Sequence, residues 1–449
     1  MRLTILLLLT TLNLLGQNIE GIILDADTKL PLKNVNIFFK KGNTGTTSNV
    51  KGAFNLNLKS EINEDDTIHF SMIGYGAKDI LYSDLKKINF FVCLSKKVES
   101  ISEITVTSNK VLKPEIEFHQ LSSLNEGLYA FGSLLLNGNI YVIGGNGSYY
   151  EDNAKRAFLE ASNTEDLSFQ NFTNRLKPGS FLERYNNSLQ IYNIENDTWS
   201  ISKLKLLERA NHSINYYNNQ IYILGSKSLS TNRKFEYLEN KIEILDLKNE
   251  TIKIDDTNPH QALNSQTFIY KNGLIILGGS VKLKNDGNKV FTNKTHLFDF
   301  STGYWYELND MPRAKEAKGV IIKDRIYLIG GYDNKALTEI ESYNLGTGKW
   351  ETEGELFDGI EGPALTYHGN LIYIYNLDKV LTFNIVTKVL NEYRINLRIQ
   401  NSALHYYDNK LYILGGYIEN EYSTSPSSKL YSIDISEFLN TKIIKSKTL

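Results

Sequence analysis

The chain has 449 residues, with 49 lysines and arginines against 51 aspartates and glutamates, so its formal net charge is −2. This balance excludes a strong overall attraction to nucleic acid or to an anionic membrane. The composition, with 41% hydrophobic and 22% charged residues, is that of a globular chain of roughly two to four domains. Cys93 is the only cysteine, which excludes an internal disulfide and any metal site built from several thiolates.

Residues 1–16 begin with one arginine, continue as an apolar stretch and end on a small residue. This order is typical of a secretory signal peptide, with cleavage expected near Gly16–Gln17. The stretch is too short to cross a bilayer, which takes about 20 apolar residues, and no later stretch qualifies as a membrane helix. We therefore expect export to the periplasm, the outer-membrane surface or the medium.

Short alternating segments separated by turn residues fill residues 17–108. They span residues 19–26, 35–41, 53–59, 67–76, 88–95 and 101–108. Strands of this length and spacing predict an antiparallel β-sandwich. Cys93 falls inside one of these strands, where we expect a small buried apolar side chain.

This region resembles the carboxypeptidase-regulatory-like domain found at the N-terminus of exported Bacteroidetes proteins. The residues that carry the resemblance are Gly21, Asp25, Pro31-Leu32, Val35, Gly45-Thr46, Gly52, Phe54, Ile73-Gly74-Tyr75, Leu94 and the closing segment 103–107. One departure is the segment 48–52, where family members often carry an acidic turn. The resemblance implies an accessory module without catalytic activity.

From residue 113 onward a unit recurs, anchored by an apolar strand that often runs into a glycine pair. The six anchors begin at Ile140, Ile221, Leu274, Ile326, Leu371 and Leu411. A turn signal and an earlier apolar strand precede each anchor, and a third strand follows it. A short fourth segment carries Trp199, Trp305 or Trp350 in three units. Four strands in each of six units predict a six-bladed β-propeller over residues 113–436, with 437–449 left as a tail.

The units resemble kelch repeats, through the glycine pair, the later tyrosine and the tryptophan. The second unit departs with Gly225-Ser226, and the fifth with Tyr375-Asn376 and no tryptophan. The resemblance implies a galactose oxidase-like propeller, a fold shared with N-acetylneuraminate epimerase. Galactose oxidase uses copper beside a cysteine–tyrosine crosslink, and the only cysteine here lies outside the repeats. We therefore expect no copper site.

The last unit supplies only three strands, so closing the ring requires one more. The segment 115–121 precedes the first unit and stands where a fourth strand would be, so we predict that it completes the sixth blade. The alternative is the segment 441–445 in the tail. That tail resembles the end of a Bacteroidetes sorting domain, but no residues remain to build such a domain.

In an antiparallel meander, the start of strand one and the end of strand two lie on one face. The loops after strand two are long, with an insertion at 146–186 and shorter ones at 226–239, 280–294 and 418–428, and long loops on a rigid scaffold often carry recognition. The candidate binding residues on this face are Arg209, His212, Arg313, Lys315, Tyr332, Glu361, Arg398 and Tyr417. Alternative roles stay open: the arginines could brace neighbouring loops, and the histidine and tyrosines could pack as ordinary repeat residues.

Three functional hypotheses follow. The first is an exported binding protein without cofactor or metal, expected to be a monomer, whose propeller face recognises a protein or a glycan at the cell surface while the sandwich serves for docking. The second is a sugar-modifying enzyme such as a sialic acid epimerase, which needs an acid–base pair on the face, for example Glu361 with an arginine. The third is a structural surface component. We favour the first and expect no catalytic residues.

Overall fold

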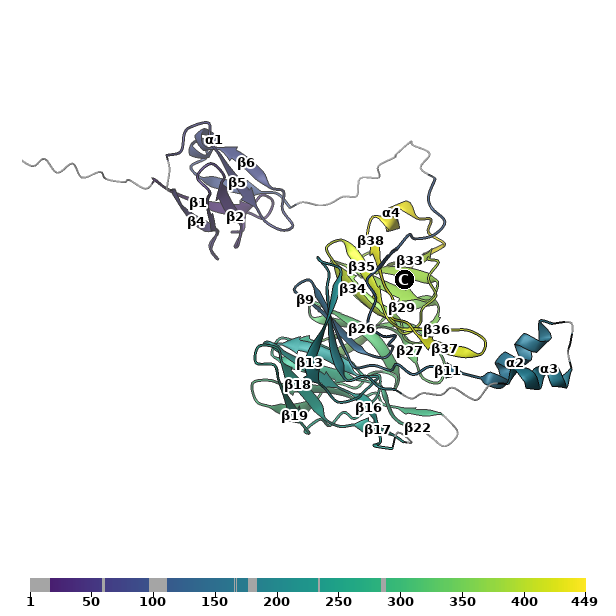
Figure 1. The fold of residues 1–449 in the computed structure, drawn as a ribbon. Helices are drawn as coiled ribbons and strands as arrows, with labels where there is room; N and C mark the ends of the chain where they lie inside the picture. Colours follow the sequence, from purple (N-terminus) through teal and green to yellow (C-terminus); the bar gives the residue numbers. More distant parts are fainter. Residues whose placement is uncertain are drawn as a thin grey trace, which may run out of the picture. The chain divides into compact units, whose positions relative to one another are not determined.

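The computed structural model describes residues 17–58, 61–96, 111–164, 166, 168–176, 184–232, 235–283 and 288–449 (Figure 1). The chain divides into two compact units, residues 1–109 and 110–449. The predicted signal peptide and the predicted strand at 101–108 lie outside the described residues.

The first unit is a sandwich of two sheets in the orders β4-β1-β7 and β3-β2-β5-β6. Its elements are β1 (Gln17–Asp25), β2 (Asn36–Phe39), β3 (Thr44–Thr47), β4 (Ala53–Leu58), β5 (Thr67–Ser71), β6 (Lys78–Leu81), α1 (Tyr82–Lys87) and β7 (Phe91–Leu94). Every second residue of β4 is buried, namely Phe54, Leu56 and Leu58, so one face of its sheet lines the core as the alternation predicts.

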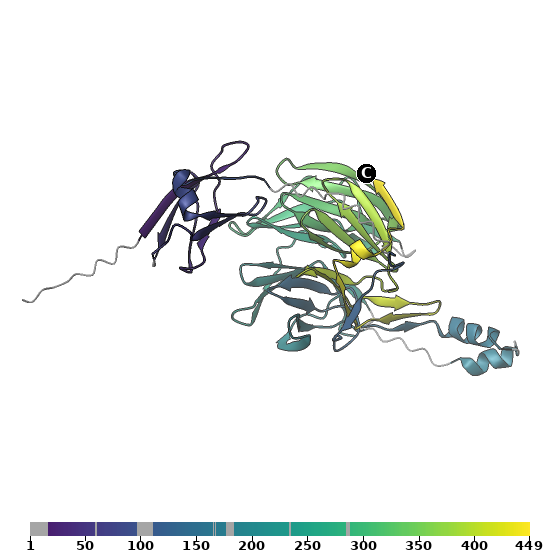
Figure 2. The same ribbon diagram turned by 90° about the horizontal axis from the view of Figure 1, so that it is seen from above.

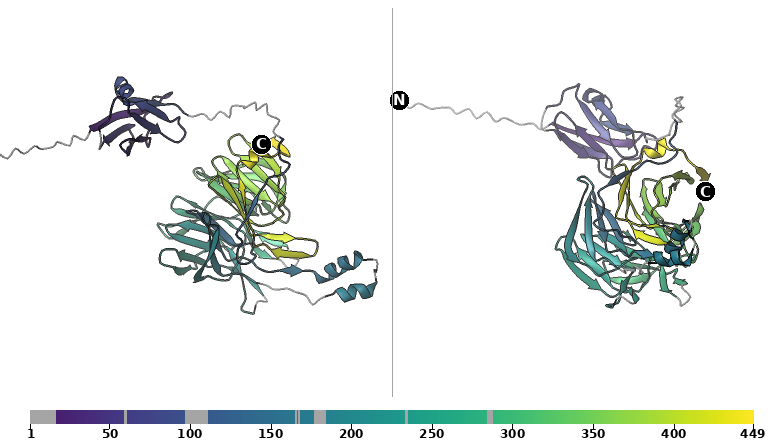
Figure 3. Two further views of the ribbon diagram at one scale, coloured as in Figure 1. Left: turned by 45° about the horizontal axis from the view of Figure 1, so that its top comes forward. Right: turned by 45° about the vertical axis from the view of Figure 1, so that its right-hand side comes forward.

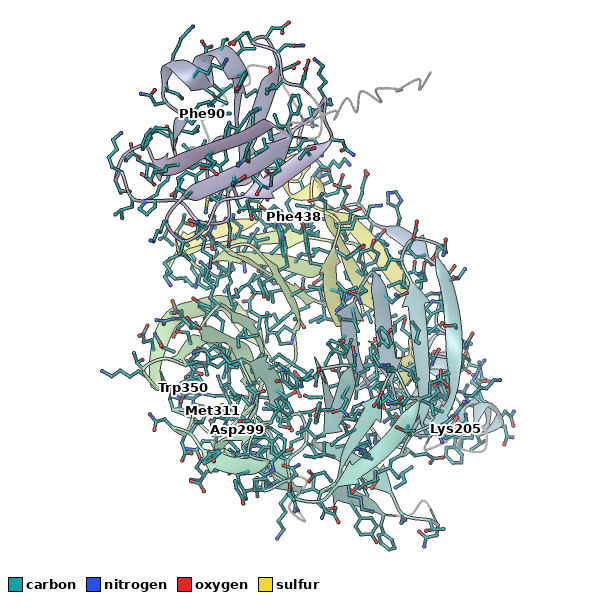
Figure 4. The ribbon with its side chains drawn as sticks, turned by 90° about the vertical axis from the view of Figure 1, so that its left-hand side faces the viewer. Phe90, Lys205, Asp299, Met311, Trp350 and Phe438 are labelled. Carbon is teal, nitrogen blue, oxygen red and sulfur yellow. The ribbon has the colours of Figure 1, made fainter. Side chains whose placement is uncertain are left out.

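The prediction of a purely antiparallel sandwich is wrong at one pair of strands, because β7 runs parallel to β1. The short helix α1, which the sequence analysis did not predict, connects β6 of the second sheet to β7 of the first. Phe90, labelled in Figure 4, ends this connection and packs its ring against Tyr82 of the helix at 6.2 Å. Cys93 in β7 is half-buried rather than buried.

The second unit is a propeller-type domain made of antiparallel sheets, six of which have four or five strands in the described residues. Sheets one to three contain β9 (Gly132–Leu136), β10 (Asn139–Ile143), β12 (Ser188–Asn193) and β13 (Thr198–Lys205); β14 (Ser213–Tyr217), β15 (Gln220–Leu224), β18 (Ile242–Asp246) and β19 (Thr251–Asp255); and β20 (Gln266–Tyr270), β21 (Gly273–Leu277), β24 (Thr295–Asp299) and β25 (Tyr304–Glu307).

Sheets four to six follow in the same way along the chain. They contain β26 (Glu316–Ile322), β27 (Arg325–Tyr332), β28 (Leu337–Asn344) and β29 (Lys349–Ile360); β30 (Ala364–His368), β31 (Leu371–Asn376), β32 (Lys379–Asn384) and β33 (Val389–Arg394); and β34 (Ala403–Tyr407), β35 (Lys410–Leu414) and β38 (Leu430–Asp434). The first strands contact one another in the closed sequence β9, β14, β20, β26, β30, β34 and β9 again. The sheets therefore succeed one another around a common centre, as the right-hand view of Figure 3 shows.

The two ends of the second unit close the last two sheets. Strand β8 (His119–Leu121) pairs with β38 as the fourth strand of the sixth sheet, which confirms the predicted closing segment. The tail does not stay outside the ring, because β39 (Lys445–Thr448) pairs with β33 as a fifth strand of the fifth sheet. Between β38 and β39 along the chain, α4 (Glu437–Asn440) places the ring of Phe438 (Figure 4) 5.3 Å from that of Tyr373 and 5.2 Å from that of Tyr393.

The glycine pairs and the tryptophans have physical roles in the sheets. At Gly331 φ is +121°, and a Cβ there would lie 2.4 Å from the Glu316 carbonyl oxygen, so no larger residue fits the turn. Trp350 stacks on Tyr343 at 4.8 Å, and its indole N–H donates to the Asn309 carbonyl at 3.4 Å. It packs in the same apolar cluster as Met311, beside it in Figure 4, so it ties the outer strand to the preceding connection between sheets.

Further elements extend the loops that follow the second strands. They are β11 (Tyr150–Glu151), α2 (Asn153–Ser162) and α3 (Phe169–Arg175) in the first sheet, β16 (Ser226–Leu229) and β17 (Glu236–Glu239) in the second, β22 (Ser280–Leu283) and β23 (Lys289–Phe291) in the third, and β36 (Tyr417–Glu419) and β37 (Ser423–Pro426) in the sixth. Strand β11 pairs with β37, which joins the first loop to the last. Figure 2 shows α2 and α3 projecting away from the sheets.

Candidate functional site: the loop-bearing face and the central channel

The loops after the second strands share a face with the residues that open each unit. Single bridges join Ala210 to Lys227, Leu263 to Ser280, and Gln400 to Tyr417. Each bridge pairs a residue before a first strand with the residue that follows a glycine pair or its equivalent. The predicted gathering of these loops on one face is therefore confirmed.

Two candidate binding residues do not reach that face. Arg209 is fully buried and pairs with Glu243 of its own sheet at 2.7 Å. Lys315 is buried in the same way, with its amine 2.6 Å from Glu341 and 3.1 Å from the Gly330 carbonyl. Both side chains brace a third strand from inside the sheet. Because both side chains are buried, they are not exposed to a ligand, and the prediction that they are binding residues is wrong.

Burial shifts the pKa values of Arg209 and Glu243, the ion pair of the second sheet. It lowers the pKa of Arg209 and raises the pKa of Glu243, in each case against the attraction of the opposite charge. Each group is thus held in its charged form by its partner, and removing either one leaves an uncompensated buried charge.

Two other candidates, Arg313 and Arg398, remain accessible on the surface. Arg313 is 43% exposed and pairs with Asp333 at 3.4 Å and Glu339 at 3.0 Å, which fits the bracing role. Arg398 is exposed. Neither arginine lines a pocket with Glu361 in the described part of the chain.

Glu361 and Tyr417 come together in a small pocket of about 100 Å³ on the loop-bearing face. It is lined by Asn264, Glu316, Ala317, Lys318, Glu361, Gly362, Asn376, Gln400, Asn401 and Tyr417. Burial raises the pKa of Tyr417 to about 12, and its hydroxyl donates to the Gln400 side chain at 3.3 Å. Tyr332 approaches this pocket through Lys289, whose amine lies 5.3 Å above its ring and 2.9 Å from Glu316.

Three hydrogen-bonded side chains form a polar collar beside this small pocket. They are Asn211, Asn264 and Glu316. The Asn211 amide donates to Asn264 at 3.0 Å, and the Asn264 amide donates to Glu316 at 3.0 Å. Glu316 also accepts from Ser280 at 2.7 Å and from Lys289 at 2.9 and 3.0 Å. Its negative charge is therefore already matched within the protein.

Below the collar, the first strands of all six sheets line a central channel of about 360 Å³. His212 lies here, and its Nε2 is 3.1 Å from the Gly132 amide and 3.0 Å from the Ile143 carbonyl. His405 lies on the other side of β9, 3.0 Å from the Ser133 hydroxyl. Burial lowers the pKa of His212 to about 3 and that of His405 to about 4, so both rings are neutral at neutral pH.

Lys318 is the channel residue that the sequence analysis missed. It lines both the small pocket and the channel, and burial lowers the pKa of its amine. The available signal was a lysine two residues after Glu316 in the first strand of the fourth unit, whose other residues are apolar or glycine. No group of three or more histidine, cysteine, aspartate or glutamate side chains suited to a metal ion occurs among the described residues.

The two family matches lie on opposite sides of the boundary between the two structural units. Residues 19–106 match the CarboxypepD_reg-like domain, and residues 179–340 match the Attractin/LZTR1 beta-propeller. Two curated relatives from Danio rerio are similar to part of the chain. Kelch-like protein 41a is 26% identical over 145 residues, 31% of this chain and 22% of that protein. Kelch-like protein 41b is 23% identical over 206 residues, 44% of this chain and 31% of that protein.

The chain thus spans less than a third of the length of either relative. None of the helices in the described residues has the length and apolar character needed to cross a membrane. On the matches and the observed sheets together, the protein contains a carboxypeptidase-regulatory-like domain followed by a kelch-type β-propeller domain.

Proposed function

We propose that this protein is an exported, non-catalytic binding protein whose loop-bearing propeller face binds a partner protein, with the sandwich as a docking module. The kelch-type propeller supports a role in protein interaction. The observation that carries the proposal is a set of exposed apolar side chains on the loops of this face. They are Tyr150, Phe158, Phe169, Leu176, Phe235, Tyr237 and Ile418.

The insertion of the first sheet presents the two most prominent of these side chains on a firm support. Arg156 is buried and bonds to Glu151 and, at 2.8 Å, to Glu160. It also donates to the Arg175 carbonyl at 3.0 Å, which joins α2 to the end of α3. On this frame Phe158 is 62% exposed and Phe169 is 78% exposed. Rigid exposed aromatic side chains are typical anchors of protein interfaces.

The accessible charges of the face are mostly matched within the chain, which suits an apolar contact. Arg313 pairs with Asp333 and Glu339, and Lys289 pairs with Glu316. A partner would thus meet a neutral rim around apolar anchors, rather than a field of one sign.

The test is recovery of a cell-surface partner by the full chain, followed by its loss in a variant. We expect the double variant Phe158→Ala/Phe169→Ala to lose at least tenfold in affinity for the recovered protein. Tyr304→Ala is the matched control, because Tyr304 is 68% exposed on an outer strand away from the loops. Equal loss in both variants would contradict the proposal. So would binding to glycans alone, or turnover of a sugar substrate.

A further inference from the structure

Among the described residues that line the central channel, Lys318 is the only charged side chain, because the two histidines are neutral at neutral pH. No aspartate, glutamate or arginine lines the channel in the described part of the chain. Within that part, the Lys318 amine forms no ion pair. Glu316 attracts the Lys318 charge through space, but its carboxylate already accepts hydrogen bonds from Asn264, Ser280 and Lys289.

The neighbours of Lys318 around the ring leave space for a ligand. The strand registers place one residue from each other first strand at the same level as Lys318, because each of these residues pairs with the fifth residue of the second strand that follows it. These level neighbours are Gly132, Ser213, Gln266, Ala364 and Ala403. Three of them have no side chain or only a methyl group, and the other two can donate hydrogen bonds.

From this arrangement we propose that the channel binds a small hydroxylated carboxylate, with Lys318 as the cation that holds the carboxylate. One amine without an arginine fork matches a single negative charge better than a phosphate dianion. The serine, threonine and amide groups along the strands provide partners for the hydroxyl groups of the ligand. They include Ser133, Ser213, Ser265, Gln266, Thr267, Thr366 and Ser402.

The ligand has a route to this position from the loop-bearing face. Lys318, Asn264 and Asn401 line both the channel and the small pocket at its mouth, so the two spaces meet at these residues. The amine has a lowered pKa because it is removed from water. A bound carboxylate would replace the missing partner and favour the charged amine.

The test is isothermal titration of the full chain with D-glucuronate, D-glucuronamide and D-glucose as probes. We expect binding of glucuronate and at least tenfold weaker binding of the two neutral sugars, which differ from it only at the carboxyl position. Because this contrast is measured on the unaltered protein, it holds even if a variant fails to fold.

Variants then assign the charge to Lys318. We expect Lys318→Met to lose at least tenfold in affinity for glucuronate and Lys318→Arg to retain most of it. Lys349→Met, an exposed lysine on the outer strand of the same sheet, should bind as the unaltered chain does. Equal binding of glucuronate and glucuronamide would overturn the proposal, as would unchanged binding by Lys318→Met. Full displacement by an equal concentration of potassium chloride would also overturn it, since it would show a site for inorganic anions.

Discussion

The interiors of the second and fourth sheets hold fully buried cationic side chains, whereas the central channel holds a partly buried one, and the groups around the charge differ. Inside the sheets, Arg209 and Lys315 each contact a glutamate of a third strand at 2.7 and 2.6 Å. In the channel, Lys318 faces amides, hydroxyls and small residues. A buried cation that has its carboxylate belongs to the fold, whereas one without a carboxylate is available to a ligand.

Removing a paired cation should have the largest effect on the free energy of unfolding. Arg209→Met should lower the free energy of unfolding by about 3–5 kcal/mol, because Glu243 stays buried without a partner. Urea unfolding followed by tryptophan fluorescence measures this, since Trp199, Trp305 and Trp350 all lie in the propeller. The double variant Arg209→Met/Glu243→Leu should recover most of the loss. A single variant as stable as the original would show that the pair does not hold the sheet.

A second variant tests how much apolar packing contributes to stability compared with a buried ion pair. Trp350→Ala should cost about 2 kcal/mol, because the ring is partly buried on Tyr343 and its N–H bonds to the Asn309 carbonyl. The change is read from the urea midpoint with the two remaining tryptophans. A shift of less than a few tenths of a kcal/mol would show that the ring contributes little to the join between the third and fourth sheets.

Acid titration of the buried histidines extends this comparison, because protonation gives their rings a positive charge that has no carboxylate partner. Burial lowers the pKa of His260 and His405 to about 4 and that of His212 to about 3, from about 6.5 in an unfolded chain. The unfolded state therefore binds more protons below pH 6.5. Stability should be fully present above that pH and fall by about 2 kcal/mol per histidine between pH 7 and pH 5. Constant stability across this interval would contradict the burial of these rings as neutral groups.

The repeat pattern predicted the propeller-type fold and the closing strand well, because hydrophobic alternation and glycine turns are local signals. The role of the tail as a fifth strand was missed, since β39 pairs with β33 across a distance that no local pattern encodes. Among the site residues, the pattern placed Glu361 and Tyr417 on the face. It could not separate Arg209 from Arg398, since both stand before first strands and only the glutamate of a third strand decides which is buried.

Lys318 illustrates the same limit from the other side. In the sequence it is one lysine in a strand that also carries Glu316, while its surroundings depend on residues of five other strands that close the ring around it. The charge becomes informative only when the channel lining is known.

The most direct measurement of the contrast between paired and unpaired cations is the unfolding free energy of Lys318→Met, determined beside Arg209→Met under the same conditions. We predict a change smaller than about 1 kcal/mol for Lys318→Met, because its charge is not used by the fold and its removal leaves no carboxylate unpaired. A loss as large as that of Arg209→Met would contradict the account, since it would mean that Lys318 has a structural partner and is not free to hold a ligand.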